Sequence, residues 1–228
     1  MLTFADKVID FNKKIHFEGQ LPDGIRIMNP FRDTPSVLAT SSAFYKKYYD
    51  DFEPRHLILG INPGRHGAGL TGVPFTDPKR LKEKCGVDFE GTLAHEPSSV
   101  FVYEIIETYG GLEAFYRDFY INSPCPLGFT KINERKKEVN YNYYDSKTLT
   151  EAVSEFMVES MEKHLALGIK TDVAFCLGAG QNFKFLSKLN KYIEKENKIL
   201  RLLQLMIILV WNKKEVNFVK IGQYLAKI

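Results

Sequence analysis

Residues 56–77 of this 228-residue chain read HLILGINPGRHGAGLTGVPFTD, and this stretch decides the fold. Its first part, Leu57 to Ile61, is a short apolar run interrupted only by Gly60. Such a run is too short for a helix and passes directly into turn residues, which is typical of a buried β-strand. The sequence therefore predicts a strand that ends in a glycine-rich loop.

The loop after this strand combines a turn, flexible backbone and one aromatic ring. Asn62-Pro63-Gly64 is a turn sequence, because proline fixes φ, glycine permits positive φ and asparagine bonds to local backbone. Pro74-Phe75 places a ring at the loop's end. A plain strand-to-loop crossover would explain the glycines alone. Ligands of open α/β sheets, however, bind at the carboxyl ends of strands. The loop is neither a dinucleotide fingerprint nor a P-loop, since no GKS or GKT follows.

The rest of the chain alternates helical and extended patterns. Asp77-Pro78 is typical of a capped helix start. Residues 131–145 are polar and aromatic, which suits a surface loop or contact with a single strand of nucleic acid. The alternation predicts an α/β fold, a three-layer αβα sandwich around a central, mostly parallel four-stranded sheet, in a single domain over residues 1–228. We expect helices at 2–17, 35–49, 100–109, 146–167 and 181–192, and further strands at 117–122, 172–178 and 202–210.

Net charge, cysteine count and apolar segments exclude only a few classes of protein. Lys and Arg number 31 against 28 Asp and Glu, a net charge of +3, so charge alone does not indicate a nucleic-acid protein. Three widely spaced cysteines, Cys85, Cys125 and Cys176, suggest free thiols and are fewer than the four ligands an iron–sulfur cluster usually needs. The N-terminus lacks a signal-peptide pattern, and the apolar residues 199–211 are too short to span a bilayer as a helix. We expect a cytoplasmic protein.

Two segments of the loop resemble a known family. Gly60-Ile61-Asn62-Pro63-Gly64 followed by Thr71-Gly72-Val73-Pro74-Phe75 is similar, at the family's spacing, to the first motif of the uracil-DNA glycosylase superfamily. The resemblance is to the single-strand-selective monofunctional branch and its bacterial members. It implies a DNA repair glycosylase that hydrolyses the N-glycosidic bond of uracil, or of other deaminated or damaged bases, with water as nucleophile. It further implies a monomer acting on uracil-containing DNA, single-stranded or duplex, without a cofactor, a metal or a membrane.

The resemblance also assigns roles to residues. Asn62 is expected to orient the water. Because an amide cannot usefully take a proton, turnover should be slower than in branches with Asp there. Phe75 is expected to stack on the base, and Asn122, before the turn Ser123-Pro124-Cys125-Pro126-Leu127, to read its edge, since an amide can pair with both O4 and N3–H of uracil. The remaining substrate-binding positions are Gly60, Ile61, Pro63, Gly64, Gly72 and Pro74.

The family's second motif, which usually begins with His-Pro after the last strand, is absent. No histidine lies beyond His164 and no proline beyond Pro126. Three explanations remain: Asn212 takes the histidine's catalytic place with Lys213 and Lys214 on DNA phosphates, His66 reaches the pocket, or the altered segment leaves a weak or inactive homologue. Such a homologue would bind uracil-containing DNA or nucleotide without base release. A third class, an unrelated α/β enzyme that binds a nucleotide phosphate in the loop, also stays open.

Overall fold

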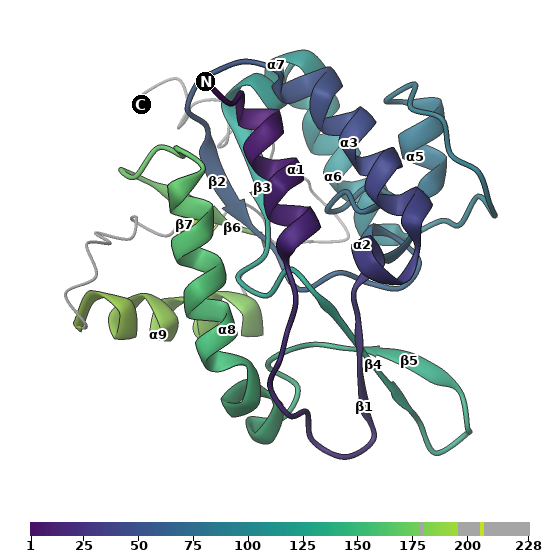
Figure 1. Ribbon diagram of the computed structural model, residues 1–228, viewed down its shortest axis with the longest axis vertical. Coiled ribbons are helices and arrows are strands. Elements are labelled where there is room, and N and C mark those ends of the chain that lie inside the picture. The colour runs from purple at the N-terminus through teal and green to yellow at the C-terminus, as the bar shows by residue number, and fades with distance from the viewer. Residues whose placement is uncertain (178–179, 196–205, 208–228) are drawn as a thin grey trace.

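The computed structural model describes residues 1–177, 180–195 and 206–207. Helices and strands are interspersed along the chain (Figure 1). The helices are α1 (Phe4–Lys14), α2 (Pro30–Asp33), α3 (Pro35–Tyr49), α4 (Ala68–Thr71), α5 (Pro78–Glu83), α6 (Pro97–Tyr109), α7 (Leu112–Asp118), α8 (Lys147–Ala166) and α9 (Gln181–Lys195). The strands are β1 (Ile25–Met28), β2 (His56–Leu59), β3 (Phe119–Asn122), β4 (Gly128–Ile132), β5 (Glu138–Tyr141), β6 (Ala174–Cys176) and β7 (Met206–Ile207).

The central sheet is parallel, as the sequence predicts. Its order is β3-β2-β6-β7, with the two-residue β7 at one edge, and every adjacent pair runs parallel. The register sets Leu59 of β2 opposite Asn122 of β3 and Cys176 of β6. Because parallel strands end at the same edge, the glycine-rich loop after β2 and the turn after β3 begin side by side.

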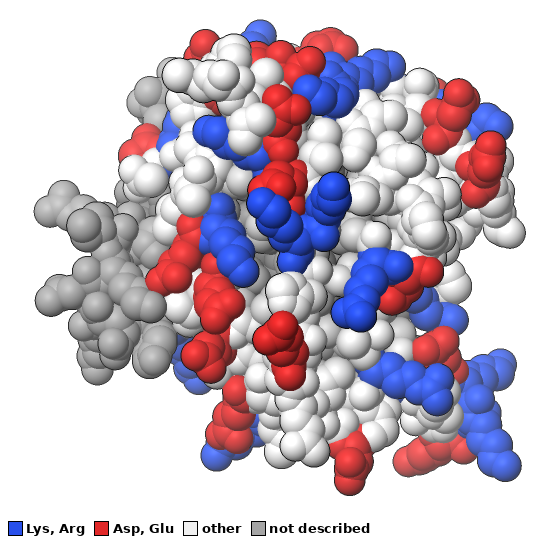
Figure 2. All heavy atoms as spheres, in the orientation of Figure 1, with Lys and Arg blue, Asp and Glu red and all other residues white. Residues whose placement is uncertain are grey.

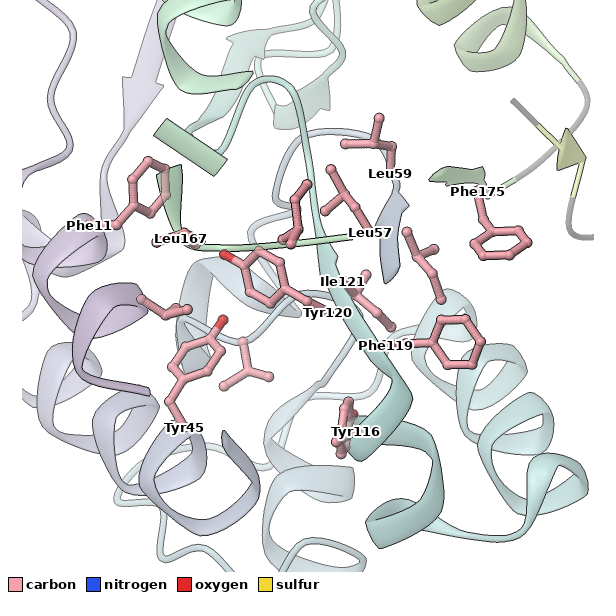
Figure 3. Close-up of a cluster of buried hydrophobic side chains, with 14 of the residues drawn as sticks. Phe11, Tyr45, Leu57, Leu59, Tyr116, Phe119, Tyr120, Ile121, Leu167 and Phe175 are labelled. Atoms are coloured by element: carbon pink, nitrogen blue, oxygen red, sulfur yellow. The ribbon is translucent and has the colours of Figure 1, made fainter. Parts of the chain in front are cut away.

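Helices cover both faces of this sheet. Successive side chains of a strand point to opposite faces. On β3, the Tyr120 ring packs against Phe4 of α1 at 5.4 Å, whereas the Phe119 ring packs against Phe115 of α7 at 5.1 Å and Tyr109 of α6 at 5.3 Å. Figure 3 shows a cluster of buried side chains around β2 and β3, with Phe119 and Tyr120 among them. The αβα sandwich is therefore confirmed.

A second, antiparallel sheet was not expected from the sequence. Its order is β1-β4-β5, and it lies beside the αβα part, at the bottom of Figure 1. Part of the polar segment 131–145 thus forms strands. The alternation in β5 is only between exposed and partly buried residues, so the hydrophobic pattern that marks a strand is weak there.

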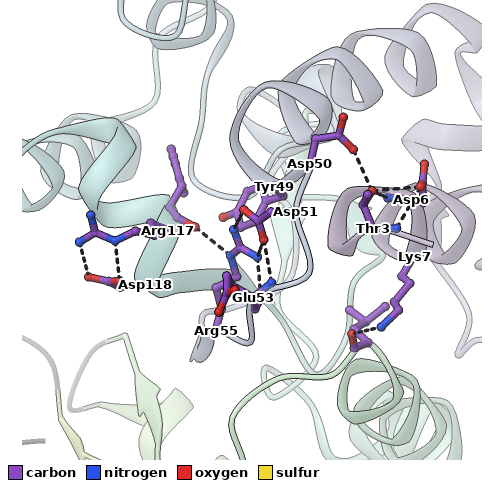
Figure 4. A network of polar contacts seen from close by, with 12 residues as sticks. Thr3, Asp6, Lys7, Tyr49, Asp50, Asp51, Glu53, Arg55, Arg117 and Asp118 are labelled. Carbon is purple, nitrogen blue, oxygen red and sulfur yellow. Dashed lines mark hydrogen bonds and ion pairs between the residues drawn. The ribbon is translucent and has the colours of Figure 1, made fainter. Parts of the chain in front are cut away.

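A buried arginine joins three elements around the start of β2. The Arg55 side chain is fully buried, and its guanidinium donates to both carboxylate oxygens of Asp51 at 2.5 and 2.6 Å. It also donates to the carbonyls of Glu53 and Tyr116 and lies over the Phe4 and Tyr49 rings. Figure 4 shows Arg55 beside Asp51, Glu53 and Tyr49. These contacts fix α3, β2 and α7 relative to one another.

Most predicted boundaries shift by one to three residues, and the two strands expected at 117–122 and 202–210 need separate comment. The strand expected at 117–122 begins at Phe119, because the preceding residues complete α7. Of the strand expected at 202–210, only Met206–Ile207 lies in the described part of the chain. The Asp77 cap of α5 is confirmed: its carboxylate accepts the Arg80 backbone N–H, with Pro78 at the first helical position. Among the described helices, none combines the length and apolar character needed to cross a bilayer.

Candidate active site

The carboxyl ends of β2 and β3 share one cavity. The Gly60 backbone N–H donates to the Asn122 carbonyl at 2.8 Å, which holds the start of the glycine-rich loop against the end of β3. The loop contributes Ile61, Asn62, Pro63, Gly64, Ala68, Pro74 and Phe75 to the cavity wall, and the rest of the wall is Glu96, Ser98, Asn122, Ser123, Asn140 and Asn142. The sequence thus brings the predicted amides and ring together from two strands.

Asn62 is held by the small antiparallel sheet and the turn after it. Its Nδ2 donates to the Tyr141 carbonyl at 3.0 Å, and its Oδ1 accepts the Tyr143 backbone N–H at 3.1 Å. Because these partners are a carbonyl and an N–H, they fix which end of the amide is oxygen. Asn62 is 4% exposed and keeps one N–H and one lone pair for a molecule in the cavity.

Phe75 closes one wall of the cavity with its ring. Its backbone φ is +54°, an uncommon conformation for a residue with a side chain. A Cβ at Gly60 would overlap the Phe75 ring. The ring therefore rests directly on the Gly60 backbone, and glycine is required there for this close approach.

The amide of Asn122 is fixed in orientation by two neighbours. The Ser123 backbone N–H donates to Oδ1 at 2.8 Å, and Nδ2 donates to the Tyr120 hydroxyl at 2.5 Å. Since a backbone N–H can only donate, its acceptor must be the amide oxygen. The side chain is 4% exposed and faces the same cavity as Asn62 and Phe75.

Other predicted site residues lie elsewhere. Gly72 has φ +69°, and a Cβ there would meet Phe31, Val37 and Ser41, so it ends α4 against α2 and α3 rather than lining the cavity. His66 is exposed and is not part of the cavity wall. Asn212, Lys213 and Lys214 lie outside the described residues.

Sequence reasoning missed part of the cavity wall. Glu96 stands immediately before α6 and reads in sequence only as a helix start signal. Asn140 and Asn142 belong to the β5 segment, whose fold was not expected. The available signal was the pair of asparagines on either side of Tyr141, since side chains two residues apart in extended chain point to the same side.

Burial raises the pKa of the Glu96 carboxyl. Loss of hydration is the main cause, a hydrogen bond from Ser98 opposes it, and the nearby Asp77 carboxylate adds to it. The Asp77 Oδ2 also accepts the Glu96 backbone N–H at 2.8 Å. Glu96 is the one carboxylate among the described residues of the cavity wall.

Charge on the face seen in Figure 2 is mixed. Lysines, arginines and acidic residues are scattered among uncharged residues on this face. The exposed turn between β4 and β5 carries Arg135, Lys136 and Lys137. Within the described ranges, no three His, Cys, Asp or Glu side chains gather as a metal site would require. All three cysteines are described, are buried and form no disulfide.

Comparison with known proteins identifies the family. The family model of the uracil DNA glycosylase superfamily matches residues 46–223. The crystal structure of wild-type SMUG2 from Pedobacter heparinus is 52% identical in sequence, with a TM-score of 0.89, and the match covers 100% of this chain and 97% of that chain. None of the curated proteins matches the chain. These similarities confirm the branch that the first motif indicates, and the chain belongs to the uracil DNA glycosylase superfamily.

Proposed function

We propose that this protein is a monofunctional DNA glycosylase that hydrolyses the N-glycosidic bond of deoxyuridine, with water as nucleophile. The observation that carries the proposal is the single cavity shared by Asn62, Phe75 and Asn122 at the carboxyl ends of β2 and β3. A base must leave the DNA stack to enter such a cavity, at a cost of a few kcal/mol that is smallest in single strands.

The fixed amide of Asn122 supports uracil as the base. Uracil offers an acceptor at O4 and a donor at N3, which match the remaining Nδ2–H and Oδ1 lone pair of Asn122. Cytosine presents a donor at N4 and an acceptor at N3, the reverse pattern. To accept cytosine, the amide would have to turn over and lose the bond from the Ser123 backbone N–H, at about 1 kcal/mol, and the Tyr120 hydroxyl would have to donate instead of accept.

Phe75 and the backbone below it supply the other contacts with the base. Stacking on an aromatic ring contributes on the order of 1–3 kcal/mol per base. The Gly60 N–H is bonded to the Asn122 carbonyl, so it does not stabilise the departing uracil anion. That task falls to the other donors facing the cavity, such as the free N–H of Asn122.

Monofunctional hydrolysis fits the chemistry of the cavity wall. No lysine is among its described residues, so none of them offers an amine that could form a covalent intermediate with the sugar. The sugar then passes through an oxocarbenium-like state and is captured by water. Asn62 orients that water with its remaining N–H and lone pair.

The direct test offers oligonucleotides containing one uracil, as single strand and as duplex. Abasic sites are detected by alkaline strand cleavage. We expect base release from both, and faster release from the single strand. An oligonucleotide with cytosine at the same position is the control and should stay intact. Failure of the purified wild-type chain to release uracil from either form would contradict the proposal.

Four variants at three positions connect the activity to residues. Asn62→Ala should remove most base release, and Phe75→Ala should weaken substrate binding. Replacing Asn212 by His and by Ala tests whether it stands in for the family's second-motif histidine: a gain with His and a loss with Ala supports that role. Wild-type rates in Asn62→Ala would overturn the proposed water-orienting role.

A second candidate, a homologue that binds uracil-containing DNA without releasing the base, has one specific observation in its favour. The chain has no histidine beyond His164, and His164 is buried with its ring against Phe11 and Tyr120. This candidate predicts retention of uracil-containing DNA in a gel shift, with no abasic sites formed.

A further inference from the structure

Glu96 is the feature of the cavity to which the family motifs assign no role. Glu96 precedes α6, and its side chain packs against the glycine-rich loop at Gly64 and Gly67. A Cβ at Gly64 would lie 2.6 Å from the Glu96 Oε1, and one at Gly67 would overlap its Oε2. The two glycines therefore make room for a carboxylate on the wall of the cavity that holds Asn62.

Fixed neighbours hold Glu96 in this place. Its backbone N–H is bonded to the buried carboxylate of Asp77, and its carboxylate accepts a hydrogen bond from Ser98. Asp77 is in turn bonded to Arg80 at 3.0 Å. Asp77 thus fixes the backbone of Glu96, and Ser98 orients its side chain.

Among the described residues, Glu96 forms no ion pair, because the nearby Arg80 and His95 lie against Asp77 instead. From the α5 side, Arg80 and His95 face Asp77, with His95 Nδ1 3.8 Å from the Asp77 Oδ2. Arg65 and His66 lie on the loop between the two glycines. From β5, the neutral Nδ2 of Asn140 lies near Gly64. A desolvated carboxylate without a cationic partner is a good proton acceptor, because its charged form is poorly stabilised.

The cavity otherwise lacks a base. Asn62 can orient a water but cannot take its proton, and the rest of the described wall is amide, hydroxyl, backbone or apolar. We propose that Glu96 is the general base of this site, and that Asn62 holds the water whose proton Glu96 accepts. This inference rests on the proposed glycosylase function.

The step balances without a further reactant. The water oxygen forms a bond to C1′ of the deoxyribose, and one water proton passes to the Glu96 carboxylate. The C1′–N1 bond breaks, and its electron pair leaves on uracil as the anion. The products are an abasic site, the uracil anion and protonated Glu96, which returns its proton to solvent.

The decisive experiment measures single-turnover base release by Glu96→Gln across pH 5–9, on single-stranded uracil-containing DNA. We expect the rate at pH 8 to fall about 100-fold or more, and the decline of rate toward acid to disappear, because glutamine cannot take a proton. Affinity for the DNA should change little. Glu104→Gln, an exposed position on the same helix, is the matched control and should keep the wild-type rate and pH profile.

Two further variants test the role of Glu96 if Glu96→Gln folds poorly. Ser98→Ala removes a hydrogen bond that lowers the Glu96 pKa, so it should shift the acid-side decline to higher pH while activity persists. Glu96→Asp should retain a decline at a lower rate. A wild-type rate and profile in Glu96→Gln, or an unmoved decline in Ser98→Ala, would overturn the inference and leave the glycosylase proposal standing. A wild-type chain that releases no uracil would overturn both.

Discussion

At the residue scale, the cavity depends on amides whose orientation other groups dictate. Asn62 is fixed by backbone and Asn122 by one backbone N–H and one phenol. The sequence could predict these asparagines, because the motif and the strand end mark them. It could not predict their partners, because Tyr141 and Tyr143 are about 80 residues from Asn62.

Tyr120→Phe tests the phenol that orients Asn122. Loss of the hydroxyl leaves Asn122 Nδ2 without that acceptor, so the amide is held by the Ser123 backbone N–H alone and is positioned less firmly. We expect KM for uracil-containing DNA to rise about 3- to 10-fold, equivalent to about 1 kcal/mol of binding, with a smaller fall in kcat because the same amide faces the departing anion.

Tyr49→Phe is the control for Tyr120→Phe. It also deletes a buried phenol hydroxyl, bonded to the Phe119 carbonyl at 3.0 Å, but Tyr49 does not line the cavity. Both variants should lose similar stability in thermal unfolding, and only Tyr120→Phe should change KM. An equal KM in the two variants would exclude an orienting role for Tyr120.

At the element scale, the sequence predicted the large helices and the three main strands of the parallel sheet because their apolar periodicity is strong. It missed the β1-β4-β5 sheet because those strands are short, partly polar and paired between distant segments. The sequence did not predict Glu96 as a cavity residue for a related reason. Its side chain reaches the cavity because the segment before α6 lies against the glycine-rich loop, and no local sequence pattern encodes that contact.

Substitution of Arg55 tests whether its buried contacts hold α3, β2 and α7 together. Arg55→Lys keeps a positive charge but loses the planar fork that binds Asp51 and the Tyr116 carbonyl. We expect the free energy of unfolding to fall by roughly 2–4 kcal/mol, because buried polar partners lose their donors. Urea unfolding followed by circular dichroism measures it.

Arg117→Lys is the matched control for Arg55→Lys. Arg117 also bonds an aspartate, Asp118, but its side chain is 66% exposed. Such a surface pair contributes about 0–1 kcal/mol, so the unfolding midpoint should stay close to that of the wild type. If the unfolding midpoint of Arg55→Lys also stayed close to that of the wild type, the buried network would not hold these elements together.

At the scale of the whole molecule, a buried histidine makes stability depend on pH. His164 of α8 is fully buried, its Nε2 donates to the Ser123 carbonyl at 3.1 Å, and its ring contacts Phe11 of α1. Burial lowers its pKa from 6.5 to about 4. The folded protein therefore holds it neutral, whereas the unfolded chain takes up a proton below about pH 6.5.

The sign of the effect follows from this difference. The stabilisation is complete above pH 6.5 and is lost as pH falls from 6.5 toward 4, by on the order of 3 kcal/mol. His164→Gln should unfold more readily than wild type at pH 7.5 but lose less stability on acidification. His16→Gln, at an exposed ring, should keep the wild-type acid loss. Parallel stability–pH curves for wild type and His164→Gln would contradict this assignment.

The bonds from Asn62 to Tyr141 and Tyr143 have a consequence for any genetic dissection of this protein. One carboxamide both lines the cavity and connects the end of β2 to the end of the small sheet, so a substitution at position 62 changes both. A substitution at position 62 that abolished turnover would also remove the hydrogen bonds to Tyr141 and Tyr143, which hold the second sheet against the loop after β2. Under the proposed water-orienting role, base release and the docking of the second sheet depend on the same carboxamide.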